Sequence, residues 1–237
     1  MMKQQYVVVD FEMNPVAKAN REVRGKMGLE IIEIGAVRLD ESYTVVDKFR
    51  CFVRPQYNKE IASYITGLTG ISRYETYNAP PFAEALRRFE NWIGYDARTV
   101  VYSWSDSDLQ QIRSECAFKQ LPLPDNMGEW VDFQAMYASA MDYPAERGLM
   151  ALHTAAEQFG IGMDFSHSHS ALYDAEITTE LLIPVLTGEY VRQAALLRGA
   201  SLGDPEDGGC SIGDCCGGVL QELLRRCAED RPSGMAS

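Results

Sequence analysis

Two acidic residues at the end of an apolar run are the first feature of the sequence with chemical potential. The run Tyr6–Glu12 is rich in Val and ends with Asp10, Phe11 and Glu12. Because side chains alternate along a β-strand, the two acids point to one face and Phe11 points to the other, into the core. The Cα atoms of the acids would lie about 6.6 Å apart, so both carboxylates can reach one hard cation. Acids in a central strand need a cation or hydrogen-bond donors, whereas at a solvated strand end they need neither.

A second pair of acids, Asp106 and Asp108, lies where an apolar strand turns into a helix. One of them could cap the helix, since Asp is a favoured N-cap residue. Two acids spaced by two positions leave one free to face a site. We expect that one to be Asp108, at the base of the helix.

A third group combines an imidazole with a carboxylate. If a helix starts near Ser170, His169 stands at its start and Asp174 follows about one turn later, so the two side chains can flank one point. The alternative is a solvated Ser-rich loop, because two of the three His residues lie in this turn. The remaining one, His153, falls inside an amphipathic helical pattern and is interpreted as structural.

Taken together, these residues fit phosphodiester cleavage assisted by two metal ions. That reaction needs carboxylates that hold two cations roughly 3.5 to 4 Å apart, and a base that deprotonates water at neutral pH. An imidazole suits the base role. A structural Ca²⁺ site is the competing interpretation, but it would leave His169 without a purpose, and the sequence lacks the closely spaced acidic loop of calcium sites.

The elements that must position these residues predict an α/β fold. Three β-rich runs come first, and an antiparallel meander is their simplest connection, over residues 6–12, 30–39 and 43–53. Helices and strands then alternate. Apolar spacing predicts the helices at residues 80–94, 108–119, 148–159 and 171–186. Short apolar runs predict the strands at residues 99–104 and 130–133. This order favours a mixed sheet flanked by helices.

Length and composition predict one large domain, residues 1–195, followed by an acidic tail containing Gly and Cys, residues 196–237. A short helix could span residues 218–229 of the tail. The four Cys of the tail lack the paired spacing of common zinc modules. Two further Cys in apolar patterns, Cys51 and Cys116, are expected to be buried thiols.

The formal net charge of −12 argues against a protein that coats long duplex DNA through a broadly basic surface. It leaves open a nucleic-acid enzyme whose site is built from carboxylates. No apolar run approaches the roughly 20 residues of a membrane span, and the first residues lack the apolar stretch of a signal peptide. We therefore expect a cytoplasmic protein with no membrane partner.

The order of these residues resembles the three exonuclease motifs of the DEDDh 3′-to-5′ exonucleases, the DnaQ/RNase T-like superfamily. The motifs are carried by Asp10-Phe11-Glu12, by Asp108, and by His169 with Asp174. Two linking segments resemble the branch that includes the histone-mRNA exonuclease, the RNAi-regulating exonucleases and the bacterial protein KapD. They are EIIEIGAV at residues 30–37 and ITGLTGI at residues 65–71. The resemblance covers about residues 5 to 190.

The resemblance implies a ribonuclease H-like fold with two Mg²⁺ or Mn²⁺ ions in the active site. Asp10, Glu12 and Asp174 would bind the first metal, and Asp10 would also reach the second. Asp108 would support the second metal. His169 would activate the attacking water, so that nucleoside 5′-monophosphates leave the 3′ end of single-stranded RNA or DNA.

A related class of the superfamily uses Tyr four residues before the last Asp. Ser170 occupies that position, which assigns the chain to the His class. The resemblance also implies substrate contacts at Phe11, Met13, Leu68, Thr69 and Trp104. For Trp104 the alternatives are stacking on the substrate and packing in the core, and packing is favoured.

A local basic stretch between the first two strands could steer a phosphate chain, or could be a solvated loop; it contains Lys18, Arg21, Arg24 and Lys26. Two other functions remain open. One is a proofreading or repair DNase that binds a polymerase, and the other is a non-catalytic nucleic-acid-binding module on the same fold. The sequence identifies no protein partner.

Overall fold

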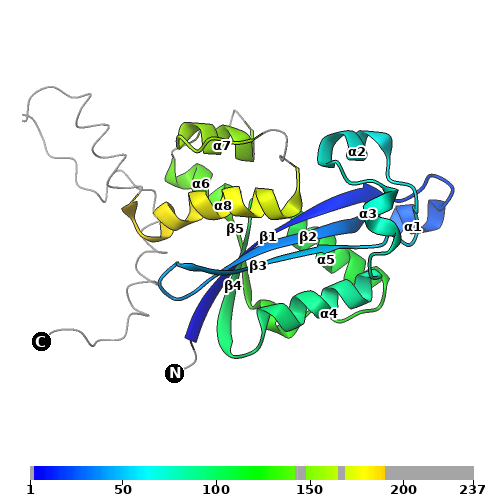
Figure 1. The fold of residues 1–237 in the computed structure, drawn as a ribbon, viewed down its shortest axis with the longest axis horizontal. Helices are drawn as coiled ribbons and strands as arrows, with labels where there is room; N and C mark the ends of the chain where they lie inside the picture. Colours follow the sequence, from blue (N-terminus) through cyan, green and yellow to red (C-terminus); the bar gives the residue numbers. More distant parts are fainter. Residues whose placement is uncertain (1–2, 142, 144–147, 165–168, 190–237) are drawn as a thin grey trace, which may run out of the picture.

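The computed structural model describes residues 3–141, 143, 148–164 and 169–189. Five strands form one sheet in the order β3-β2-β1-β4-β5 (Figure 1). The strands are β1 (Lys3–Pro15), β2 (Leu29–Leu39), β3 (Val45–Phe52), β4 (Ala97–Ser103) and β5 (Glu129–Asp132). The first three pair antiparallel as a meander, and β4 and β5 run parallel to β1. The predicted mixed sheet is confirmed.

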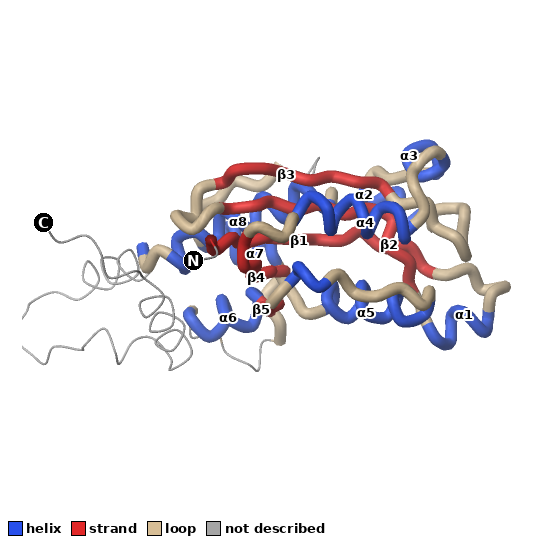
Figure 2. The backbone as a smooth tube through the Cα atoms, turned by 90° about the horizontal axis from the view of Figure 1, so that it is seen from below, coloured by secondary structure: helices blue, strands red, loops and turns tan. Residues whose placement is uncertain are grey.

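Helices cover both faces of this sheet (Figures 1 and 2). On one face α4 (Phe82–Ile93) and α5 (Ser107–Phe118) pack against Val7, Val9 and Phe11 of β1. On the other face, Val8 packs with residues of α6 (Phe133–Ala140), α7 (Leu152–Gln158) and α8 (Ala171–Leu186). The side chains of β1 therefore point alternately into two hydrophobic cores, one on each face of the sheet. Asp10 and Glu12 share the parity of Val8 and belong to the α8 face.

Several short elements were not predicted. The segment expected as a loop between the first two strands contains α1 (Arg21–Lys26), and the segment 62–78 contains α2 (Ser63–Thr69) and α3 (Arg73–Tyr77). A 3₁₀ turn, η1 (Asp125–Met127), precedes β5. None of the residues of α1 or α2 is buried, so these helices have no apolar stripe that a periodicity argument could detect.

Several predicted boundaries were wrong. The first strand, expected at residues 6–12, is β1 (Lys3–Pro15), and two other differences have a local cause. The strand expected at residues 130–133 ends at Asp132, because the Asp132 side chain accepts a hydrogen bond from the Ala135 N–H and caps α6 there. The helix expected at residues 148–159 is confined to α7, since Gly148 has φ 78° and breaks the helical path. Cys51 and Cys116 are buried, as expected. The tail, including the possible helix at 218–229 and the tail Cys residues, lies outside the described residues.

Gly35 sets the distance between α8 and the sheet. It is the β2 partner of Asp10, and a Cβ built at this position would lie 2.1 Å from the backbone C of Ala171 and the backbone N of Leu172. Only a residue without a side chain lets the first turn of α8 lie directly on the sheet next to Asp10. Among the described helices, none has the length and hydrophobicity that a membrane crossing requires.

We predict that Gly35→Ala lowers the free energy of unfolding by about 3 kcal/mol, because the new methyl group meets fixed backbone rather than a movable side chain. The arrangement of the side chains at the start of α8 should change with it, since this turn must shift away from the sheet. Chemical denaturation measures the first effect. Gly25→Ala in α1 is the matched control, because a Cβ there meets no atom within 4 Å. A Gly35→Ala chain as stable as its parent would contradict the close contact of α8 with β2.

Candidate active site

Three separate parts of the chain bring ligand-type side chains to one end of β1. The carboxylates of Glu12 and Asp174 and the imidazole of His169 offer atoms that all lie within 4.8 Å of one another. Glu12 comes from β1, Asp174 from the first turns of α8, and His169 from just before the N-cap Ser170. The imidazole of His169 and the carboxylate of Asp174 therefore lie close enough together to flank one point.

His169 occupies an uncommon backbone conformation for a residue with a side chain. Its φ is 65°, in the left-handed region. The side chain is exposed. A non-glycine residue held in this region at the mouth of a helix indicates that the surrounding structure determines its direction. The result is an imidazole that faces solvent while lying next to two carboxylates.

Asp108 is tied to β1 by a specific hydrogen bond. The pairing of β1 with β4 ends at Val8 and Tyr102, so the later part of β1 has no strand partner on that side. The Asp108 carboxylate supplies the acceptor that a neighbouring strand would provide, and it accepts a hydrogen bond from the Phe11 N–H at 3.0 Å. Asp106 occupies the N-cap position, but its side chain makes no capping bond and accepts instead from the Gln110 side-chain amide. Asp108 itself is 4% exposed and faces inward.

Glu33 is a fifth carboxylate that sequence reasoning missed. It pairs in register with Glu12, is fully buried, and accepts from the Ala171 N–H at 3.2 Å. It also pairs with the guanidinium of Arg50 on β3. Ser170 makes no side-chain capping bond, so the Glu33 carboxylate satisfies the start of α8 instead. The signal in the sequence was an acid inside the apolar segment EIIEIGAV.

Burial and repulsion by neighbouring acids raise the pKa of four acids at the site, Asp10, Glu12, Asp108 and Asp174. Burial, followed by the charges of the neighbouring acids, raises the pKa of Asp10 well above its ordinary value. Burial and then Asp174 raise the pKa of Glu12 to about 9. Burial raises the pKa of Asp108 to about 7, against the opposing hydrogen bond from Phe11. These carboxylates resist being charged together unless positive charge joins them.

Asp174 shows the need for a cation most directly. Burial raises its pKa, and the neighbouring His169 lowers it. Its Oδ1 atom is buried without a hydrogen-bond partner among the described residues. A buried carboxylate oxygen without a donor is costly, and a bound cation would satisfy it. The donor set, carboxylate oxygens with one imidazole, fits a hard divalent cation.

The raised pKa values predict how stability depends on pH when no metal is bound. A carboxyl group with a folded pKa above its unfolded value binds more protons in the folded state, so stability falls as pH rises between the two values. The ordinary values are 4.5 for Glu12 and 3.8 for Asp108, and their folded values are about 9 and about 7. The free energy of unfolding in EDTA should therefore fall from pH 5 to pH 9, by about 1 kcal/mol per pH unit or more.

Urea denaturation at several pH values measures this slope. Millimolar Mg²⁺ or Mn²⁺ should flatten it, because the cation replaces the protons and releases them on binding. Glu12→Gln should reduce the slope in EDTA, because it removes one of the titrating groups. Equal stability at pH 5 and pH 9 in EDTA would show that burial and repulsion do not raise the pKa values of these acids in the folded chain.

The positions expected to contact substrate divide into two groups. Leu68, on α2, is 49% exposed, and the Thr69 hydroxyl on the same helix bonds the Ile65 carbonyl. Met13 is half-buried and packs against the core on the α4 and α5 face. Phe11 is 5% exposed with its ring in that same core, as the strand alternation predicted. Any contact from Phe11 would therefore have to come from its main chain.

Trp104 is a core residue. It is 8% exposed, its ring packs against Phe133 and Tyr137, and its indole N–H donates to the Met150 carbonyl. This corrects its placement among the substrate contacts and agrees with the packing alternative. His153 is exposed on α7. The basic stretch forms an exposed edge around α1, where Lys26 pairs with Glu22.

Comparison with known proteins agrees with this geometry. A family model described as exonuclease (RNase T) matches residues 7–182. ERI1 exoribonuclease 2 of Danio rerio is 30% identical over 203 residues, which cover 76% of this chain and 35% of that protein. DNA polymerase III PolC-type of Caldanaerobacter subterraneus is 30% identical over 183 residues, 77% of this chain and 12% of that protein.

Solved structures share the fold. The nuclease domain of 3′hExo, a DEDDh family member bound to rAMP, superposes with a TM-score of 0.67 at 21% identity, covering 78% of this chain and 92% of that one. The chain spans about a third of the length of its exoribonuclease relative and about an eighth of the polymerase. The family match covers the sheet from Val7 of β1 onward, and it includes every carboxylate of the site and His169. The chain belongs to the exonuclease family.

Proposed function

We propose that the chain is a divalent-metal-dependent 3′-to-5′ exonuclease that acts on single-stranded nucleic acid. It hydrolyses the terminal phosphodiester bond and releases nucleoside 5′-monophosphates. The observation that carries this proposal is the gathering of four carboxylates with raised pKa values beside an exposed imidazole. RNA is slightly favoured as the substrate, because the sequence resembles the exoribonuclease branch of the family.

The carboxylates would hold the metal. Asp10, Glu12 and Asp174 would supply oxygen ligands for one Mg²⁺ or Mn²⁺, and Asp10 and Asp108 would support a second. When bound, divalent cations stabilise negative charge on the phosphate and on the leaving oxygen. Asp108 also has a structural role, because its carboxylate accepts a hydrogen bond from the Phe11 N–H and thereby fixes the strand that carries Asp10 and Glu12.

His169 would act as the general base. Its imidazole accepts a proton from a water molecule as the water oxygen attacks the terminal phosphorus. The bond from phosphorus to the 3′ oxygen of the preceding nucleotide then breaks, and that oxygen takes up a proton. The terminal nucleotide leaves as a 5′-monophosphate. The exposed position of His169 lets it return the proton to solvent between cycles.

Two labelled substrates test the proposal. An oligoribonucleotide and the matching oligodeoxyribonucleotide, each labelled at the 5′ end, are incubated with the chain and Mg²⁺ or Mn²⁺. A ladder of products shortened from the 3′ end is expected, and EDTA should abolish it. If the chain binds the oligonucleotides without shortening them, the exonuclease proposal fails and the non-catalytic nucleic-acid-binding module is the remaining interpretation. DNA shortened far faster than RNA would favour a DNase, which the polymerase relative makes the second candidate.

A further inference from the structure

A cationic pocket lies outside the carboxylate site. It has a volume of about 1000 Å³ and is lined from the segment after β3, from α3, from the start of α4 and from the end of α5. Four of its lining residues are basic: Arg54, Lys59, Arg73 and Lys119. None of the described residues that line it is acidic. In a chain with a net charge of −12, such a concentration of positive charge requires a reason.

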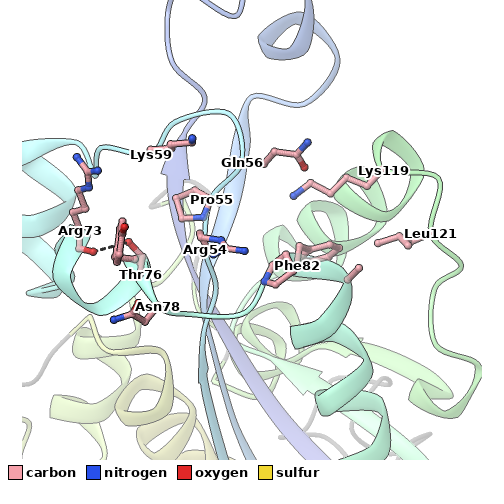
Figure 3. A pocket seen from close by; sticks show the side chains of 13 residues that line it. Arg54, Pro55, Gln56, Lys59, Arg73, Thr76, Asn78, Phe82, Lys119 and Leu121 are labelled. Carbon is pink, nitrogen blue, oxygen red and sulfur yellow. Dashed lines mark hydrogen bonds between the residues drawn. The ribbon is translucent and has the colours of Figure 1, made fainter.

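Two of the four cations are already neutralised. Lys119 pairs with the buried carboxylates of Glu115 and Glu30, and Arg73 pairs with Glu60. The side chains of Arg54 and Lys59 are exposed and make no ion pair or hydrogen bond with the described residues. Figure 3 shows these two side chains on the segment after β3, with Lys119 across from them. Their charge is therefore free to meet an anion.

The backbone that carries these two cations is fixed. The buried Glu30 carboxylate accepts three N–H groups of the segment, from Gln56, Tyr57 and Asn58, at 2.8 to 3.0 Å. At the other end, the Arg54 N–H donates to the Pro80 carbonyl beside α4. A cation presented from a rigid backbone loses less conformational freedom on binding than one on a mobile loop.

The same segment is anchored to the end of β1 that carries the catalytic acids. Asn14 lies two residues after Glu12 and is fully buried. Its side chain donates to the carbonyls of Asn58 and Glu60, and it accepts from the Ala62 N–H, just before α2. Lys59, which lines the pocket, therefore lies in the short stretch that leads to α2, the helix that carries Leu68. The pocket and the carboxylates are at the same end of the sheet, the carboxylates of β1 and α8 on its α8 face and the pocket beside α4 and α5, so a strand that joins them must pass the end of the sheet.

One wall of the pocket offers an aromatic surface. Tyr77, at the end of α3, lines the pocket and is 62% exposed, and the Arg73 guanidinium lies 5.8 Å from its ring centroid. Single-stranded nucleic acids bind to surfaces that combine cations for the phosphates with exposed rings for the bases. A small anion such as inorganic phosphate would have no use for the ring.

We propose that this pocket binds the phosphodiester backbone of the substrate strand, several nucleotides upstream of the 3′ end held at the carboxylates. The proposal rests on the proposed exonuclease function for the identity of the strand. Arg54 and Lys59 contact the phosphates, and Tyr77 stacks on a base. The pocket adds positive charge at this end of an acidic chain, and it favours strands long enough to reach it.

The test is a binding measurement that does not depend on catalysis. Fluorescence anisotropy in EDTA compares the parent with the double variant Arg54→Ala/Lys59→Ala, using a 20-nucleotide single strand and a trinucleotide. The affinity for the long strand should fall roughly tenfold, and that for the trinucleotide should stay the same. The slope of log K against log salt should become shallower by about 1.4, since each phosphate contact on a single strand contributes about 0.7.

A matched control removes one Arg and one Lys at the other end of the sheet. Lys3 and Arg98 are exposed at the start of β1 and β4, and Lys3→Ala/Arg98→Ala should leave both affinities and the slope as in the parent. Tyr77→Ala should weaken long-strand binding without changing the salt slope, because stacking releases no counterions.

The outcomes separate the pocket from the proposed function. Equal long-strand affinity in parent and Arg54→Ala/Lys59→Ala overturns the proposal, and so does an equal loss for the trinucleotide. Stabilisation of the parent, but not of the double variant, by inorganic phosphate with unchanged strand binding assigns the pocket to a free phosphate ligand and also overturns it. If the parent cleaves no nucleic acid while the double variant still loses strand affinity, the pocket proposal stands and the exonuclease function fails.

Discussion

Asp174→Asn is expected to lower the exonuclease rate by about 10³-fold while making the metal-free chain more stable. The two effects have one cause. Asp174 contributes a carboxylate oxygen that is buried without a donor, and burial raises its pKa, so the charged group is held in the fold at a cost. Asn has the same shape without the charge. The substitution removes the free-energy cost of the buried charge, and it also removes the charged metal ligand. Because charge stabilisation by a metal lowers the activation free energy by several kcal/mol, the rate should fall.

Three measurements separate these effects. Single-turnover cleavage of a labelled oligonucleotide gives the rate, and urea denaturation in EDTA at pH 8 gives the stability. The stabilisation that Mn²⁺ adds, about 2.7 kcal/mol at a concentration 100 times its dissociation constant, should shrink in the variant. Glu180→Gln is the control, because Glu180 is an exposed acid on the same helix. A metal-free Asp174→Asn chain less stable than its parent would mean that this carboxylate holds the fold together rather than a cation.

The local parts of the site could be predicted because they follow from short-range geometry. Strand alternation places Asp10 and Glu12 together opposite Phe11, whatever the rest of the fold does. A helix that starts at Ala171 puts Asp174 within reach of His169 for the same reason. The long amphipathic helix α4 and the apolar strands were predicted from the spacing of apolar residues, which depends only on neighbouring positions in the sequence.

The missed parts depend on contacts between distant segments. Glu33 reaches the site only because the β1–β2 register sets it beside Glu12 and because Gly35 lets α8 descend onto the sheet. Its ion pair comes from Arg50 on a third strand. The Asn14 side chain likewise joins β1 to a segment more than forty residues away. Strand register and interstrand partners cannot be deduced from a single sequence, so these contacts could not be predicted.

His169→Ala is expected to reduce the exonuclease rate by about 10² to 10⁴-fold while changing metal affinity little. The reason is that the imidazole and the carboxylates would have different roles, the imidazole in proton transfer and the carboxylates in metal binding. His169 is exposed and held at φ 65°, whereas the carboxylates beside it are half-buried or buried. An exposed imidazole can exchange protons with water, and the buried acids supply the charge that a divalent cation needs.

The geometry also permits the opposite assignment, and the experiment decides between the two. The imidazole lies within 4.8 Å of ligand atoms of Glu12 and Asp174, so it could bind the cation itself. If His169 is the base, the variant keeps its Mn²⁺-induced stabilisation, and free imidazole restores part of the rate by entering the space that the side chain left. If His169 is a ligand, stabilisation by Mn²⁺ falls together with the rate, and imidazole rescue should then accompany recovered metal binding. His153→Ala, which removes an exposed imidazole on α7, should leave rate and metal binding unchanged and so shows that loss of any His is not enough.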